Sequence, residues 1–228
     1  MARESKRVLY AITDETERGV QFGSGLILKN FEYQPIEEMS EFDEAIDAAV
    51  MNGQALGAID GGANVNITVT YGRPSIDGLG MFPFKGMEIP ESLECYIAVT
   101  IKEFSPDKIQ SVYGTSRFMY GGGDALSQRI QTAIAPEDYY DNITWVGTTN
   151  FGYIMISVFN VLGKSGGAIN AVEGVAAGGI PFRADGNLSS FKDTNFVPAE
   201  IKYFYTSKTD LDEVLLRIDE HRITLPTD

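Results

Sequence analysis

Residues 64–71 alternate between apolar and polar side chains without a break, and this pattern restricts the fold more than any other feature of the chain. The two sets are Val65, Ile67, Val69 and Tyr71 on one side and Asn64, Asn66, Thr68 and Thr70 on the other. A period of two is typical of a β-strand that buries one face. The second face of this strand therefore meets water, a ligand or another subunit.

Other runs rich in β-branched and aromatic residues predict further strands. These runs lie at 7–12, 94–104, 142–148, 152–161, 179–185 and 200–206. Glycine clusters, which mark turns or loops that need positive φ, lie at 23–25, 61–62, 121–123, 166–167 and 178–179. Short strands separated by such turn signals favour an all-β sandwich or barrel.

Three segments have helical patterns. Residues 36–50 place an apolar stripe opposite a strongly acidic face. Residues 105–114 begin with Ser105 as a helix cap and Pro106 at the first helical position. Residues 209–221 are acidic at the start and basic at the end, as the helix dipole prefers.

Charge and composition exclude several classes of protein. The chain has 228 residues, a net charge of −14, and a single Cys and a single His. Tight binding of nucleic acid requires Lys and Arg residues that neutralise phosphates. Because the chain is strongly acidic, we expect no tight binding to DNA or RNA. One cysteine cannot form an internal disulfide. No apolar run approaches the ~18 residues of a membrane-spanning helix, and no signal peptide is evident. We therefore expect synthesis in a cytoplasm, without classical export or a membrane partner.

The sequence contains no recognisable catalytic or metal-binding motif. His221 cannot form a triad or a metal site alone, and Cys95 lies among apolar neighbours in a predicted strand, where a thiol is inert. The segment at 162–167 lacks the first glycine of a phosphate-binding loop and is interpreted as a hairpin turn. The segment at 121–130 is interpreted as a loop leading into a helix. We expect no catalysis, no cofactor and no metal.

The segments between about 55 and 206 follow a characteristic order. A Gly-Gly strand precedes an acidic residue with glycine, and a long strand ending in Glu-Phe precedes a short helix. An Asp-Tyr strand then leads to a hairpin, a proline-bearing strand and a last strand entered by a proline. The matching positions are Gly61, Gly62, Asp77, Gly78, Glu103, Phe104, Asp138, Tyr139, Asn142, Pro181, Phe182 and Pro198. This order resembles the major tail (tail tube) proteins of long-tailed bacteriophages, especially the siphophage type.

The resemblance implies a mainly β fold, a β-sandwich or barrel of two antiparallel sheets flanked by a short α-helix, with long loops. It implies one tail tube domain over 1–206, followed by a C-terminal helix and tail at 207–228. Six copies would form a ring, and rings would stack into the tube through which the genome reaches the host. An acidic chain suits such a conduit because like charges reduce adhesion of DNA.

The resemblance also implies partners and a location. The partners are further copies of the chain, the tape measure, distal tail and terminator proteins, and viral DNA passing without tight binding. The location is the virion tail, assembled in the cytoplasm of the host bacterium. A loop or helical arm at 30–55 could contact the neighbouring ring, which makes its apolar residues candidates for the subunit interface: Ile36, Met39, Phe42 and Ile46. The same stretch could equally be a helix packed on its own domain.

Three other functions fit parts of the sequence. A distal tail or tube-terminator protein of similar fold would form rings that stack no further. A carbohydrate-binding β-sandwich would expose some of its aromatic residues. Aromatic residues make up 11% of this chain in total. An enzyme with a pair of carboxylates would need a polar cleft, and no particular pair among the 32 acidic residues is marked by the sequence.

Overall fold

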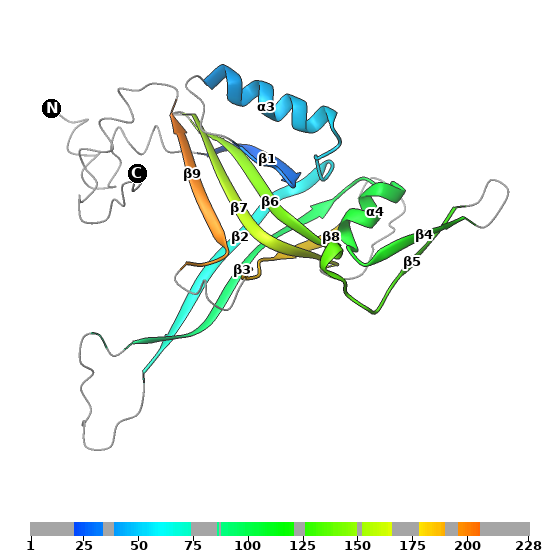
Figure 1. The fold of residues 1–228 in the computed structure, drawn as a ribbon. Helices are drawn as coiled ribbons and strands as arrows, with labels where there is room; N and C mark the ends of the chain where they lie inside the picture. The colour runs from blue at the N-terminus through cyan, green and yellow to red at the C-terminus, as the bar shows by residue number, and fades with distance from the viewer. Residues whose placement is uncertain are drawn as a thin grey trace.

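The computed structural model describes residues 21–33, 39–73, 86, 88–120, 126–149, 152–165, 178–189 and 196–205. Strands dominate this part of the chain, and two α-helices accompany them (Figure 1). The elements in chain order are β1 (Gln21–Lys29), α3 (Met39–Met51), β2 (Ile59–Gly72), β3 (Ile89–Ile101), α4 (Pro106–Val112), β4 (Ser116–Tyr120), β5 (Leu126–Ile130), the 3-10 turn η1 (Pro136–Asp138), β6 (Tyr139–Thr149), β7 (Gly152–Ser165), β8 (Ile180–Asp185) and β9 (Ala199–Tyr205).

Seven of the described strands form one antiparallel sheet in the order β1-β6-β7-β8-β3-β2, with β9 as an additional partner of β7. The first half of β7 pairs with β9, and its last four residues pair with β8. Asn160 lies between the two pairings and adopts a left-handed φ of 51°. Its side-chain amide donates to the backbone carbonyl of Asn187 (3.1 Å), and the side-chain amide of Asn187 donates to the backbone carbonyl of Asn160 (2.7 Å). The sheet therefore changes direction at this point of β7.

The change of direction allows the two halves of the sheet to pack face to face. Residues of β1 and β6, such as Ile27 and Trp145, share one buried cluster with Ile97 of β3 and Phe182 of β8. The segments at the two edges of the sheet are also joined. Residues 54–56, which lead into the edge strand β2, form backbone hydrogen bonds with the other edge strand, β1. The predicted β-sandwich with a short helix is confirmed by this arrangement.

Helix α3 covers one end of β1, β6, β7 and β9 (Figure 1). Four aromatic rings hold it there. Phe42 of α3 stacks on Phe204 of β9 with 4.5 Å between ring centroids and also contacts Tyr33 and Tyr153 at 4.8 and 5.0 Å. The helix runs from Met39 to Met51, and the first three residues of the predicted helix, 36–38, lie outside the described residues.

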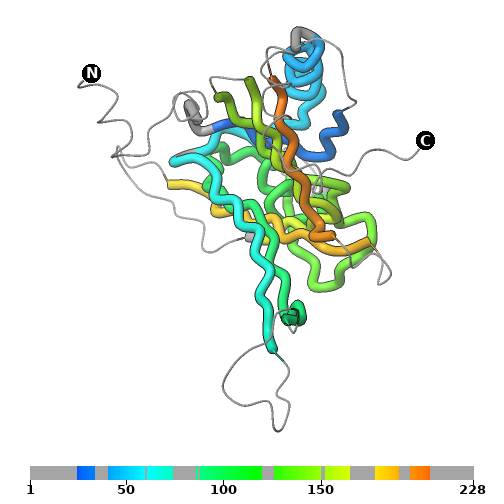
Figure 2. The backbone as a smooth tube through the Cα atoms, turned by 90° about the vertical axis from the view of Figure 1, so that its left-hand side faces the viewer, coloured from blue at the N-terminus to red at the C-terminus, as the bar shows by residue number. Residues whose placement is uncertain are grey.

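Two hairpins project from the body of the protein. The outer part of the β2–β3 hairpin extends well below it in both views (Figures 1 and 2). The β4–β5 hairpin forms a separate two-stranded sheet and extends from the end where α4 lies (Figure 1). These projections place strand surface outside the core of the domain.

Most sequence predictions of strands agree with the structure, and several need correction. The predicted strand at 7–12 and the helix at 209–221 lie outside the described residues. Residues 126–130 form strand β5, so the predicted helix there is wrong, and residues 162–165 continue β7 instead of forming a turn. Gly163 serves close packing, because a Cβ there would lie 2.8 Å from the carbonyl oxygen of Ser111 on α4.

Candidate functional site

The polar side of the strand at 64–71 belongs to a larger surface on the outside of the sheet. Because directly paired residues point to the same face, the register aligns this side of β2 with residues of β3, β8 and the end of β7. We call this surface the polar face and define it by Asn64, Asn66, Thr68, Thr70, Glu94, Tyr96, Lys164, Arg183 and Asp185. The opposite side of β2 contributes Val65 and Ile67 to the edge of the core.

Arg183 organises the charges of the polar face. Its guanidinium donates to Glu94 of β3 at 2.8 Å and to Asp185 of its own strand at 2.6 Å. It also lies over the ring of Tyr96, 3.8 Å from the centroid, in a cation–π contact. Lys164 of β7 binds the second oxygen of Asp185 at 2.9 Å. The described charges of this face therefore comprise two carboxylates and two cations, all paired.

These contacts shift the titration of the network. Hydrogen bonding to Asp185 and then to Glu94 raises the pKa of Arg183. Partial burial acts to raise the pKa of Asp185, but the hydrogen bonds from Arg183 and Lys164 outweigh it, and the pKa is lowered. Both shifts favour the charged forms of Arg183 and Asp185 at neutral pH, and their opposite charges compensate each other.

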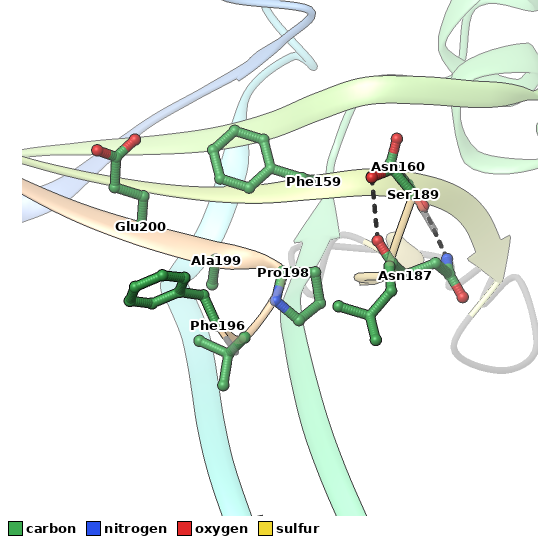
Figure 3. Close-up of a pocket in the computed structure, with 10 residues that line it drawn as sticks. Phe159, Asn160, Asn187, Ser189, Phe196, Pro198, Ala199 and Glu200 are labelled. Atoms are coloured by element: carbon green, nitrogen blue, oxygen red, sulfur yellow. Dashed lines mark hydrogen bonds between the residues drawn. The ribbon is translucent and has the colours of Figure 1, made fainter. Parts of the chain in front are cut away.

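An apolar groove lies on the other side of the β2–β3 hairpin, where the hairpin leaves the body. It holds about 480 Å³ and is lined by Val69, Tyr71, Pro90, Glu91, Ser92, Leu93, Leu188, Phe196 and Val197. Tyr71 is 59% exposed and Phe196 80% exposed. A neighbouring pocket of about 380 Å³ shares Leu188, Phe196 and Val197 with it, and the Asn160–Asn187 contact forms one wall of that pocket (Figure 3). We call the two together the hairpin groove.

The predicted interface residues of the 30–55 segment have different positions. Phe42 is completely buried in its aromatic cluster, which leaves this side chain no surface for a neighbouring subunit. Ile46 is partly buried against the same cluster. Met39 is the first residue of α3, and Ile36 lies outside the described residues. Of the two possibilities for this stretch, the packing matches a helix held on its own domain.

Reactive groups elsewhere in the described chain have structural partners. Lys29 donates a hydrogen bond to Ser111 at 3.0 Å, and burial lowers the pKa of this lysine. A catalytic serine–lysine pair has the same two features. Ser111, however, is 2% exposed and donates to the carbonyl of Asp107, so no substrate can reach it. Burial raises the pKa of Cys95 to about 11 and keeps this thiol protonated.

Further features of the described chain do not indicate a reactive site. Asp138 is buried and paired with Arg117. Among the described residues, no group of His, Cys, Asp and Glu could hold a metal ion. None of the helices in that part of the chain is long and apolar enough to span a membrane.

No protein-family model matches the chain, and no curated protein matches it. The polar face and the hairpin groove are therefore interpreted from their own geometry. Sequence reasoning found the polar side of β2, but it missed Arg183 and Asp185, because only the pairing of β8 with β3 brings them to this face.

Proposed function

We propose that this chain is a structural subunit that assembles as stacked hexameric rings into a tube, as the major tail proteins of long-tailed bacteriophages do. The observation that carries the proposal is the projecting β2–β3 hairpin with an open strand edge. In the described part of the chain, β2 pairs with β3 alone, although it runs for 14 residues. Among the described strands, its other edge has no partner for the backbone N–H and C=O groups from 64 to 72.

A long open edge is a template for pairing with another chain, and soluble proteins usually cover or interrupt such edges. The described β2 contains no proline and no lysine, the residues most often used for interruption. Closing copies of the chain into a ring would pair every such edge and leave none exposed. An edge of this length in a two-stranded hairpin is therefore more consistent with assembly than with a monomeric function.

The two sides of the hairpin suggest how copies are oriented in the ring. The hairpin groove exposes apolar side chains, including Tyr71 and Phe196, and exposed apolar patches commonly mark contacts between proteins. We assign this side to contacts between subunits. The polar face, with its paired charges, is assigned to the channel, where few unpaired cations would hold DNA phosphates.

The whole chain, purified at increasing concentration, can be tested by negative-stain electron microscopy. We expect long hollow tubes. Rings that stack no further would favour the distal tail or terminator function instead, and a chain that stays monomeric at every concentration would contradict both.

Two variants test whether the open edge of β2 is responsible. The double variant Thr68→Lys/Thr70→Lys places two like charges on each exposed edge, and we expect it to abolish tubes while the domain stays folded. Glu137→Lys reverses a charge on the exposed surface of η1, away from the β2–β3 hairpin, and changes the net charge by the same amount, so it serves as the matched control. Tubes of normal length from the double variant would contradict a role for this edge.

A further inference from the structure

The β4–β5 hairpin is not explained by the function proposed above. Its five-residue strands pair only with each other among the described strands (Figure 1). A hairpin with no further strand is marginally stable in water unless it packs against something else. Contacts at its base join it to the body, including the ion pair of Arg117 with Asp138 and the hydrogen bond from the Ser116 N–H to the carbonyl of Tyr113 (2.8 Å). The outer part needs another source of stability.

One face of this hairpin is apolar and exposed. Phe118 lies opposite Gln128 in the register, and alternation places Leu126 and Ile130 on the same face. Leu126 and Ile130 are each 57% exposed, and Phe118 is 37% exposed. Three large apolar side chains on one face of a thin projection form a surface that favours burial against a partner.

The charge of the hairpin is opposite to that of the chain as a whole. Arg117 and Arg129 are directly paired on the second face, and the described residues of β4 and β5 include no carboxylate. Arg129 is exposed and forms no ion pair with any described carboxylate. The chain carries a net charge of −14, so a second copy is a partner of suitable charge.

Helix α3 offers the complementary surface. It carries four exposed carboxylates and no basic residue: Glu41, Asp43, Glu44 and Asp47. At its C-terminal end Val50 and Met51 are exposed, Met51 by 86%. Acidic and apolar side chains thus lie next to each other on α3, whereas the basic and apolar side chains of the β4–β5 hairpin lie on its two faces and meet along the edge of β5.

We propose that the β4–β5 hairpin of one copy docks on α3 of a second copy. The outer edge of β5, which no described strand covers, lies along the helix. Leu126 and Ile130, on one face of the hairpin, then approach Val50 and Met51, while Arg129, on the other face, approaches the carboxylates of the helix. The hairpin points away from its own α3, so the contact joins two different surfaces and propagates from copy to copy (Figure 1). This inference rests on the proposed assembly and names one of its interfaces.

Disulfide trapping between two single variants tests the contact directly. Arg129→Cys and Asp47→Cys are purified separately, mixed under mild oxidation and separated without reductant. We expect a cross-linked dimer from this mixture and none from Lys202→Cys mixed with Asp47→Cys. The native Cys95 is buried and contributes little background. Absence of the cross-link under conditions where the unmodified chain forms tubes would overturn the docking alone. A cross-link without tubes would support the docking and contradict the tubular function.

A charge exchange gives a second readout. Arg129→Glu replaces attraction by repulsion, and we expect it to raise the concentration needed for assembly by about tenfold. Adding Asp47→Arg to the same chain should restore assembly. Circular dichroism establishes that both variants are folded. Equal assembly by Arg129→Glu and the unmodified chain, or no recovery in the double variant, would overturn the contact.

Discussion

Replacing Phe42 by alanine tests whether α3 is an integral part of the domain. The side chain is completely buried, and its ring contacts Tyr33, Tyr153 and Phe204 at centroid distances of 4.5 to 5.0 Å. Truncating a buried phenylalanine costs about 3–5 kcal/mol of unfolding free energy, because apolar burial is lost and a cavity remains. For a chain of this size that lowers the midpoint of thermal unfolding by roughly 6–20 °C.

The measurement is thermal and urea unfolding of the unassembled chain, followed by circular dichroism at low protein concentration. Met51→Ala is the matched control on the same helix, because this side chain is 86% exposed, and we expect a change within about 0.5 kcal/mol. If Phe42→Ala changed the unfolding free energy by less than about 1 kcal/mol and yet prevented assembly, Phe42 would belong to an interface between subunits. That result would refute the packing described for α3.

Three further predictions concern single residues of the core and its border. Hydrogen bonds from the backbone N–H of Ala135 and from Arg117 lower the pKa of Asp138, so its contribution to stability is present above the pKa of the unfolded chain and is lost as pH falls. We expect urea midpoints of Asp138→Asn and the unmodified chain to differ at pH 6 and to converge only when the pH falls below the lowered pKa of Asp138. Because Cys95 is buried and its pKa is raised to about 11, we expect its reaction with a thiol reagent at pH 8 to require unfolding, and fast reaction of the native chain would contradict its burial. Gly25 has a φ of +75° and a Cβ there would lie 2.2 Å from Nε1 of Trp145, so Gly25→Ala should lower the unfolding midpoint, whereas an unchanged midpoint would contradict this close approach.

The sequence predicts the parts of the fold that rest on local periodicity. The alternation at 64–71 and in the strand containing Cys95 corresponds to β2 and β3, because one face of each strand is buried in the core. Ser105 at the cap position and Pro106 at the first helical position predict the start of helix α4, and the structure has this helix at Pro106–Val112. In each case the local signal and the tertiary packing favour the same conformation.

The rest depends on contacts between distant segments. Strand β5 has no buried face, as its residues are exposed apart from Gln128, so its sequence shows no alternation that a core would impose. Strand β1 contains Gly25, which belongs to a glycine cluster that predicts a turn. In the structure this glycine instead leaves room for the ring of Trp145 against the strand. The charge network of the polar face was equally invisible, since Arg183 and Glu94 are 89 residues apart. Only the register of β8 on β3 brings them together.

Cryo-electron microscopy of the assembled full-length chain tests the proposed function most directly. We predict a hollow tube of stacked six-membered rings, in which neighbouring β2–β3 hairpins pair along the open edge of β2 and the polar face around Arg183 lines the channel. A monomeric protein at high concentration, or a tube whose channel is lined by the acidic side of α3 instead, would contradict this assignment.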